Sequence, residues 1–599
     1  MAWYDEAVFY HIYPLGLAGA PKQNDYGEPV HRLNTLLPWV DHIKEIGGSA
    51  LYIGPLFESV GHGYETTDYK KLDSRLGTNE DLTAFVAYCH EQGIKVIFDG
   101  VFNHTGRDFF AFKDIQANRE NSQYKDWYCN VNFWGNNEYN DGFSYDNWGG
   151  YNLLVKLNQK NPAVVDYICD VIRFWVSEFD VDGIRLDAAD VLDFDFMKAL
   201  RRTANEVKPD FWLMGEVIHG DYSRWVNGET LHSVTNYTLH KALYSGHNDH
   251  NYFEIAHTVR RLQNMGTLKL YNFVDNHDVE RIYTKLTNKA HFAPVHVLLY
   301  TRPGVPSIYY GSEFGIEGRK EYGSDDSLRP ALNIEDYKDS VKTNPCTALI
   351  AALGKVRQAV PALSYGSYDE LMLTNRQFAY ARDLDGTRVI VSVNNDDAPA
   401  GMHLAAGNCT AYIGALSGEK VSVQDGHINI TQPANSGEIW VPDGTDLDVK
   451  PVKVVTKTES EAKTNTEDKA ASETATDAKG NKEAEPKIES KESKDIVTAT
   501  ESADAKKNTT NTEKNISAAN EVKDSAKDAS AQAAANTPVD PETITVDWSK
   551  SPESMTVPEL QAAILAKLAG NGPVDAQMKK TVTDNIWHDS LVNWLKSFR

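Results

Sequence analysis

Eight short apolar segments recur in the first 310 residues, separated by longer segments in which apolar residues have helical spacing. The apolar segments span residues 8–13, 50–54, 95–99, 182–187, 211–216, 233–236, 270–275 and 306–310. Between them, Leu33–Ile46 and Glu80–Gln92 show the period of a helix, and Thr78 and Gly93 are typical of helix ends. Because strands that alternate with helices form parallel sheets, the pattern predicts an α/β fold, a (β/α)8 TIM barrel.

The spacing of the segments predicts further parts beside the barrel. Nearly sixty residues separate the third strand from the next helix, so we expect an inserted subdomain there. After residue 364, short alternating segments predict an antiparallel β-sandwich. The expected division is 1–101, first part of the barrel; 102–160, inserted subdomain B; 161–364, second part of the barrel; 365–442, C-terminal β-sandwich; 443–542, disordered linker; and 543–599, small helical module.

The inserted subdomain is rich in aromatic residues, with about thirteen between Phe109 and Tyr151. One interpretation is an aromatic core of the subdomain itself. The other is that several rings, for instance Trp134 and Trp148, line a sugar cleft, because flat rings suit the apolar faces of pyranoses.

The C-terminal part differs sharply in composition. Residues 441–547 contain no Phe, Trp or Tyr, and such a polar stretch cannot bury enough apolar surface to fold, so we expect disorder. Helical spacing returns in Val557–Leu568 and Val574–Phe598. This helical module either folds as a small bundle or docks on the preceding domains, or it binds a separate polymer or another protein.

Charge and cysteine content restrict the partners and the compartment. The formal charge of −25 argues against a nucleic-acid partner and against an anionic membrane surface. We find neither an apolar run long enough to span a membrane nor a secretory signal at the start. The five scattered cysteines are typical of free thiols in a reducing compartment. We therefore expect a cytoplasmic protein.

Acidic residues cluster at the ends of four predicted strands. The clusters are Asp99–His104, Gly183–Asp190, Gly215–Val217 and Phe273–Asp278. In a barrel, polar residues after the strands face the active site, although each cluster alone could cap a helix or form salt bridges. His104, His277, Asp187 and Asp278 could also be proposed as metal ligands, but Arg185 would place a permanent cation beside that metal.

Paired carboxylates beside an arginine suit glycosyl transfer better than metal chemistry. A retaining glycosidase needs an ionised nucleophile and a protonated acid about 5–5.5 Å apart. An adjacent Arg keeps a nucleophile ionised, and burial beside negative charge holds a proton on the acid.

The four clusters resemble, in order and spacing, the four signature regions of the α-amylase family, glycoside hydrolase family 13. Residues Phe9–Pro14 and His62–Tyr69 also look like family segments. The resemblance implies that Asp187 is the nucleophile, Glu216 the general acid and base, and Asp278 the residue that binds sugar hydroxyls and strains the ring. It further implies that Tyr64, His104, Arg185 and His277 bind substrate and that Asp99 is a structural partner near Arg185.

Finer features of the resemblance concern specificity and cofactors. Val155–Asn158 is similar to a signature of the neopullulanase and cyclomaltodextrinase group, and Ala188 favours cleavage of α-1,4 links. No cofactor is required and no catalytic metal is expected. Asn103 matches a position that binds calcium in some members, so a structural calcium stays open.

Three functions remain under consideration. The first is a retaining hydrolase that cleaves α-1,4-glucosidic bonds of maltodextrins or related α-glucans. The second is a transglycosylase, in which a sugar replaces water at the glycosyl-enzyme. The third is a non-catalytic glucan-binding or scaffold protein, against which intact Asp187, Glu216 and Asp278 argue.

Overall fold

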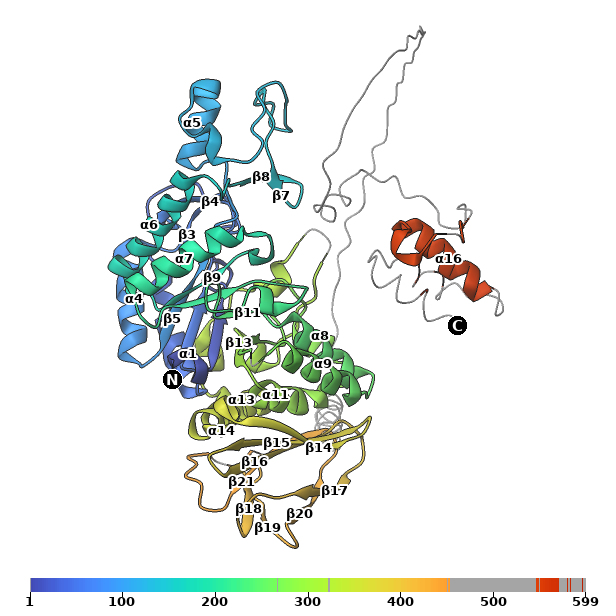
Figure 1. Ribbon diagram of the computed structural model, residues 1–599. Coiled ribbons are helices and arrows are strands. Elements are labelled where there is room, and N and C mark those ends of the chain that lie inside the picture. The colour runs from blue at the N-terminus through green and yellow to red at the C-terminus, as the bar shows by residue number, and fades with distance from the viewer. Residues whose placement is uncertain are drawn as a thin grey trace, which may run out of the picture. The chain divides into compact units, whose positions relative to one another are not determined.

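The computed structural model describes residues 2–266, 268–321, 324–449, 451–452, 546–548 and 550–569, and the single positions 579, 582 and 595. The chain divides into two compact units, Met1–Asn481 and Lys482–Arg599 (Figure 1). The described part of the first unit holds a barrel, an insertion and a C-terminal domain of strands. The second unit holds a short helical segment.

Eight parallel strands form the barrel. They are β1 (Phe9–Ile12), β2 (Ala50–Ile53), β5 (Lys95–Gly100), β9 (Gly183–Leu186), β10 (Trp212–Gly215), β11 (Ser233–Val234), β12 (Tyr271–Asn272) and β13 (Val305–Tyr309). They pair in the order β11-β10-β9-β5-β2-β1-β13-β12. A parallel bridge between Thr235 and Tyr271 joins the two ends of this sheet, which closes the ring. The TIM barrel predicted from the apolar periodicity is therefore confirmed.

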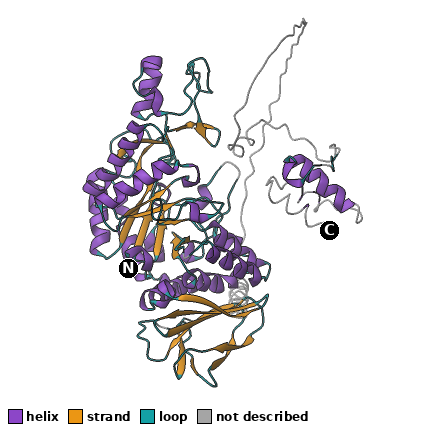
Figure 2. Ribbon diagram, in the orientation of Figure 1, coloured by secondary structure: helices purple, strands orange, loops and turns teal. Residues whose placement is uncertain are grey.

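Helices cover the outside of the strands (Figure 2). The longer ones are α3 (Leu37–Glu45), α4 (Asn79–Glu91), α6 (Pro162–Phe179), α7 (Phe194–Val207), α8 (Tyr237–Asn248), α9 (Tyr252–Asn264), α11 (Phe292–Thr301) and α13 (Pro345–Ala359). Short helices are α1 (Trp3–Glu6), α2 (Pro14–Leu17), α10 (Ile282–Lys285), α12 (Ser340–Thr343) and α14 (Ala362–Tyr365). One expected helix is divided: residues 33–46 form a 3-10 helix, η1 (Arg32–Leu36), followed by α3. Pro38 explains the division, because proline is tolerated only in the first turn of an α-helix.

The inserted subdomain packs around its own aromatic residues. Its elements are β6 (His104–Thr105), α5 (Phe110–Asn118), β7 (Asn147–Trp148) and β8 (Tyr151–Lys156), and its three strands pair in the order β6-β8-β7. Phe112, Tyr128 and Phe143 are buried together, with the Phe112 and Tyr128 ring centroids 5.4 Å apart. Trp134 is 98% exposed, so it contributes nothing to that core. A separate hairpin, β3 (Phe57–Ser59) and β4 (Thr66–Leu72), precedes α4.

The C-terminal domain consists of two antiparallel sheets. The larger contains β14 (Ser367–Leu373), β15 (Gln377–Leu384), β16 (Thr387–Asn394), β21 (Ser436–Pro442), β18 (Ala411–Gly414) and β19 (Lys420–Ser422). The smaller contains β17 (Ala400–Ala405) and β20 (His427–Gln432). Ile390 and Trp440 of the larger sheet share one buried cluster with Leu404 and Ile428 of the smaller. The predicted C-terminal antiparallel domain is therefore confirmed.

The second unit contains helix α16 (Val557–Ala569), which agrees with the helical spacing of residues 557–568. Leu560 and Ile564 of this helix are fully buried and share a cluster with Val582 and Leu595. Most of the second expected helix, 574–598, and nearly all of the expected linker, 443–542, lie outside the described residues.

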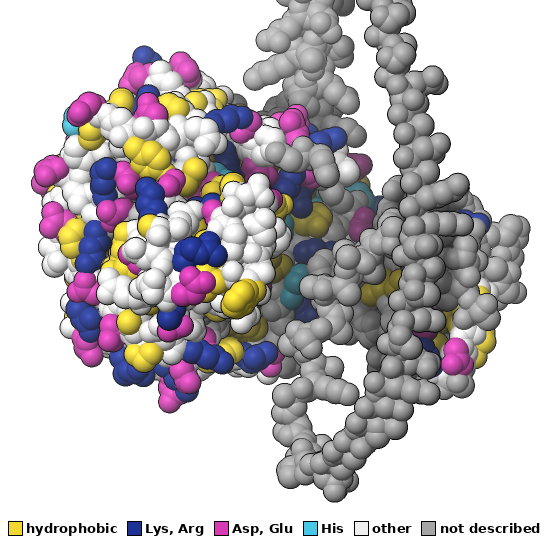
Figure 3. All heavy atoms as spheres, turned by 90° about the horizontal axis from the view of Figure 1, so that it is seen from above, with side chains coloured by type: hydrophobic (Ala, Val, Ile, Leu, Met, Phe, Trp, Pro, Cys, Tyr) yellow, Lys and Arg dark blue, Asp and Glu magenta, His cyan; other side chains and the backbone are white. Residues whose placement is uncertain are grey.

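The surface and the cysteines bear on the expected partners and compartment. Figure 3 shows Lys and Arg side chains mixed with Asp and Glu over the face that it draws. All five cysteines are free thiols, as predicted. Within the described ranges, no helix has the length and apolar character that a membrane span requires.

Candidate active site

Arg185 holds three carboxylates at the carboxyl ends of neighbouring strands. Its Nη1 lies 2.9 Å from both Asp99 Oδ1 and Asp187 Oδ1, and its Nη2 lies 2.9 Å from Glu216 Oε2. The strand register produces this arrangement, because Asp99 of β5 and Met214 of β10 are the partners of Arg185 on either side of β9. Asp99, Arg185 and Asp187 are buried, and Glu216 is half-buried.

The turn after β9 brings the backbone toward Glu216. Ala188 has a left-handed backbone conformation with φ of +46°. Its amide donates a hydrogen bond to Glu216 Oε2 at 3.1 Å, and the Tyr237 hydroxyl donates to the other carboxylate oxygen at 3.4 Å. Both oxygens of Glu216 therefore have protein donors, which fixes the carboxyl group beside Asp187.

Charge within this group favours the retention of a proton. Burial raises the pKa of Asp187, and negative charges on Glu216 and Asp99 raise it further, whereas Arg185 acts in the opposite direction. Three carboxylates around one guanidinium would carry a net charge of −2 if all were ionised. The positive charge of Arg185 opposes this excess and favours the ionised form of Asp187.

Asp278 has a contrasting environment. Its Oδ1 accepts a hydrogen bond from Arg329 Nη2 at 2.8 Å, and its Oδ2 lies 3.0 Å from His277 Nε2. Burial by itself raises the pKa of Asp278, but the interactions with His277 and Arg329 outweigh it and hold this pKa well below the usual range. Asp278 is therefore an ionised carboxylate.

Aromatic side chains lie around His277. The Tyr64 ring is parallel to the His277 ring with centroids 5.7 Å apart, and the Tyr13 ring is stacked at 5.9 Å. The Tyr64 hydroxyl also donates to Asp99 at 3.2 Å and hydrogen-bonds His277 Nε2. Tyr64 thus connects the Asp99–Arg185 group to the His277–Asp278 pair.

His104 is less directly connected to these residues. His104 begins β6 and is 1% exposed. Its Nδ1 lies 3.2 Å from Nδ2 of the Asn103 side chain. Burial lowers the pKa of His104 to about 3, so the ring is neutral near pH 7. A hydrogen bond with the backbone of Tyr64 acts in the opposite direction but does not outweigh burial. The structure therefore brings together Asp187, Glu216, Asp278, Arg185, Tyr64 and His277, and His104 lies beside the Tyr64 backbone.

Several residues of the site were not predicted from the sequence. Tyr52 donates to Asp99 at 2.8 Å, Tyr237 contacts Glu216, and Arg329 holds Asp278. Tyr52 lies within an expected strand, so its alternation could have identified it as facing the barrel interior. Arg329 lies in a loop after β13, where nothing in the local sequence indicates a role.

The alternative of a metal centre finds little support in the geometry. Among the residues that the structure describes, no three His, Cys, Asp or Glu side chains form a group able to hold a metal ion. Asn103, the residue considered for calcium, instead contacts His104 and accepts a hydrogen bond from Gln159 at 3.4 Å.

Comparisons with known proteins show the family of the chain. A family model described as the alpha amylase catalytic domain matches residues 32–346. A cyclomaltodextrinase from Bacillus sp is 31% identical over 66% of this chain and 74% of the relative. An intracellular maltogenic amylase from Bacillus subtilis is 28% identical over 65% of this chain and 69% of the relative.

A solved structure of a cyclomaltodextrinase has a TM-score of 0.66 and 27% sequence identity, and the match covers 73% of this chain and 78% of that one. These names agree with the group predicted from residues 155–158. The chain belongs to the α-amylase family of glycoside hydrolases and is an enzyme that acts on α-glucans.

Proposed function

We propose that this enzyme hydrolyses α-1,4-glucosidic bonds of maltodextrins with retention of configuration. The observation that carries the proposal is the contact of Asp187 and Glu216 with the same guanidinium of Arg185. A shared guanidinium keeps the two carboxyl groups near each other, which supports a retaining pair, because a retaining mechanism needs a separation of about 5–5.5 Å.

Asp187 and Glu216 divide the chemistry between them. Asp187 attacks the anomeric carbon while Glu216 donates its proton to the departing glycosidic oxygen, so that the bond to the leaving sugar breaks as the bond to Asp187 forms. Glu216 then removes a proton from water, which attacks the glycosyl-enzyme and releases Asp187. Arg185 supports the first step because its positive charge stabilises the ionised nucleophile.

Four further residues bind the sugar at the cleavage point: Asp278, His277, His104 and Tyr64. The ionised Asp278 accepts hydrogen bonds from two sugar hydroxyls, and these bonds strengthen as the ring becomes oxocarbenium-like. His277 and His104 bind hydroxyls of the same sugar, and Tyr64 stacks on its ring. Arg329 positions Asp278 and does not touch the substrate.

The substrate preference follows from the relatives and from Ala188. A relative named cyclomaltodextrinase supports cyclodextrins as substrates beside linear maltodextrins. Ala188 after the nucleophile supports cleavage of α-1,4 rather than α-1,6 links. The proposed reaction needs no cofactor, because Asp187 and Glu216 carry out both of its steps, and a structural calcium at Asn103 is a separate proposal.

The remaining proposals concern the organisation of the chain. We place the enzyme in the cytoplasm, a location that the five free thiols and the relative named intracellular maltogenic amylase support. It binds neither nucleic acid nor membrane. The six-part division into 1–101, 102–160, 161–364, 365–442, 443–542 and 543–599 stands as proposed, with the last part acting as a separate module that binds glucan or protein.

A product time course tests the function. The substrates are maltoheptaose, β-cyclodextrin, pullulan and isomaltotriose, each with the wild-type chain and with Asp187→Ala. Shorter α-1,4 products that disappear in the variant are expected, with no change after EDTA. Products longer than maltoheptaose would indicate a transglycosylase, and equal behaviour of the two proteins would contradict the catalytic assignment.

A further inference from the structure

A cavity of about 380 Å³ lies at the end of the barrel opposite the candidate active site. The catalytic candidates follow the carboxyl ends of their strands, whereas the residues around this cavity lie at or before the amino ends of four strands. Trp212 begins β10, His232 precedes β11, Lys269 precedes β12 and Val305 begins β13. Its volume falls within the range of about 300–1,000 Å³ that small-molecule sites occupy.

One side of the cavity carries hydrogen-bond donors without an anionic partner. Arg201 donates from Nη1 to the Thr230 carbonyl at 2.9 Å and from Nε to the Asn205 side chain at 3.4 Å. No carboxylate among the described residues forms an ion pair with it, and burial lowers the pKa of Arg201. A half-buried guanidinium of this kind is stabilised when an anion binds beside it.

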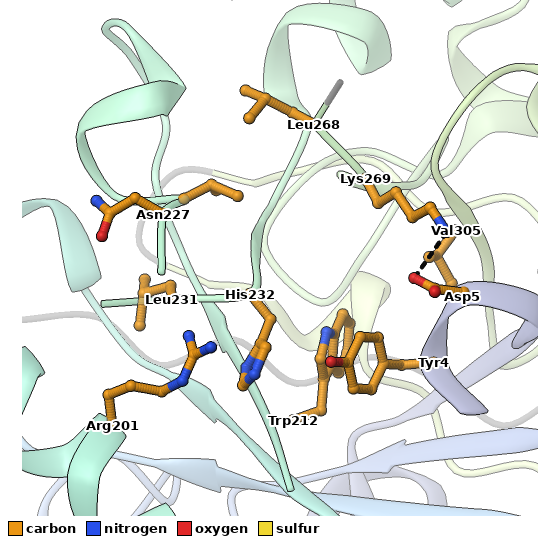
Figure 4. Close-up of a pocket in the computed structure, with 11 residues that line it drawn as sticks. Tyr4, Asp5, Arg201, Trp212, Asn227, Leu231, His232, Leu268, Lys269 and Val305 are labelled. Carbon is orange, nitrogen blue, oxygen red and sulfur yellow. Dashed lines mark ion pairs between the residues drawn. The ribbon is translucent and has the colours of Figure 1, made fainter. Parts of the chain in front are cut away.

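His232 supplies a second donor next to Arg201 (Figure 4). Its Nδ1 accepts a hydrogen bond from the Leu213 amide at 3.0 Å, so the proton of the neutral ring is on Nε2. Burial lowers the pKa of His232 to about 4, which keeps the ring neutral near pH 7. The pair Arg201 and His232 therefore offers N–H groups from two side chains, an arrangement suited to an oxyanion.

The opposite side of the cavity is already neutralised. Lys269 Nζ lies 2.9 Å from Asp5 Oδ1, so this cation has its own carboxylate (Figure 4). The cavity thus has one excess positive charge, on Arg201. A ligand with a single anionic group at one end complements this distribution.

The rest of the wall suits a sugar ring. The Tyr4 and Trp212 rings are stacked with centroids 5.9 Å apart and an interplanar angle of 20°. Trp212, Leu231 and Val305 are at most 1% exposed, so the accessible apolar surface comes from the partly exposed Tyr4, Val226 and Leu268. The lining also includes one exposed amide, that of Asn227. Apolar and aromatic surface with a few polar groups accommodates the two faces and the hydroxyls of a sugar.

We propose that this cavity is a second ligand site of the chain, which binds a phosphorylated sugar with its phosphate on Arg201 and His232. The phosphate accepts the N–H groups of the two side chains, and the sugar lies against the apolar wall. A neutral sugar provides no anion for Arg201, and inorganic phosphate makes no contact with the apolar wall, so each should bind more weakly than the phosphorylated sugar. The ligand is therefore expected to need both parts.

Isothermal titration calorimetry on the full chain tests the proposal with glucose 6-phosphate, inorganic phosphate, glucuronate and glucose. Glucose 6-phosphate is expected to bind at least ten-fold more tightly than each of the other three. Arg201→Gln should weaken that binding at least ten-fold, whereas the matched control Arg202→Gln, at the exposed neighbouring position, should leave it unchanged.

A second variant keeps the test decisive if Arg201→Gln unfolds the chain. Leu268→Trp fills the cavity, leaves all its polar groups in place and should abolish binding. Equal binding of glucose 6-phosphate and inorganic phosphate, preference for glucose or glucuronate, no binding at all, or binding that survives both variants would each overturn the proposal. Turnover of maltoheptaose by the same preparations tests the proposed function separately.

Discussion

Arg329 donates a hydrogen bond to Asp278 at 2.8 Å across a sequence separation of 51 residues. The same guanidinium donates from Nε to the His277 carbonyl at 3.0 Å and lies 3.0 Å from Asp325 Oδ2. One side chain thus fixes both the backbone and the carboxylate at the end of the segment after β12. This relationship makes Arg329 the positioning residue for a carboxylate that the sequence alone assigns to substrate binding.

Replacement of Arg329 by Gln should reduce kcat/KM for maltoheptaose by about 10- to 100-fold, because hydrogen bonds to charged groups contribute about 1.5–3 kcal/mol. Arg329→Lys keeps the positive charge and should restore part of the lost activity. The control is Arg319→Gln, whose side chain is 77% exposed. A wild-type kcat/KM in Arg329→Gln, or no rescue by Arg329→Lys, would contradict the positioning role.

Asp187→Asn and Glu216→Gln should each reduce kcat on maltoheptaose by about 10²-fold or more, since positioned acid and base groups contribute roughly 10²–10⁴-fold. Asp195→Asn is the matched control, because that side chain is 95% exposed. Initial rates of reducing-end release measure the effect. If Asp187→Asn retained wild-type kcat, Asp187 would not be the nucleophile.

Buried neutral histidines should make the chain less stable in acid. Burial lowers the pKa of His247 to about 3 from an ordinary 6.5, so between these values the unfolded chain binds a proton that the folded chain does not. Stability therefore falls as pH decreases below about 6.5, by up to about 1.4 kcal/mol per pH unit for each such histidine. His247→Gln should lower this pH slope, measured by urea unfolding at pH 7 and pH 5, and an unchanged slope would exclude His247 as a contributor.

Thr78→Ala should lower the free energy of unfolding by about 1 kcal/mol, the usual cost of losing an N-cap. Thr78 and Asp81 form reciprocal hydrogen bonds at the start of α4, with the Thr78 amide 2.8 Å from Asp81 Oδ2. Thr78→Ser keeps the hydroxyl and should remain close to wild type. Urea denaturation compares the three proteins, and equal loss in both variants would mean that the methyl group, not the cap, stabilises the helix.

The barrel and its acidic clusters could be predicted because both depend on local pattern. Each strand is a short apolar run, and each cluster follows a strand directly, so the segments 95–104 and 183–190 carry their own signal. Hydrophobic periodicity alone did not predict where α3 begins. The apolar spacing runs without a break through residues 33–46, but Pro38 can occupy only the first turn of an α-helix. Proline chemistry, not hydrophobic spacing, decided the start of α3.

The sequence by itself determined the strand order, the family and the carboxylates, because these follow from periodicity and from motifs of adjacent residues. Only the tertiary structure decided that Arg329 holds Asp278, that Tyr237 holds Glu216, and that Arg201 and His232 share a cavity at the far end of the barrel. The physical reason is ring closure. Closure of the barrel brings loops and strand ends from distant parts of the chain into contact. The local sequence pattern does not predict which of their side chains will touch.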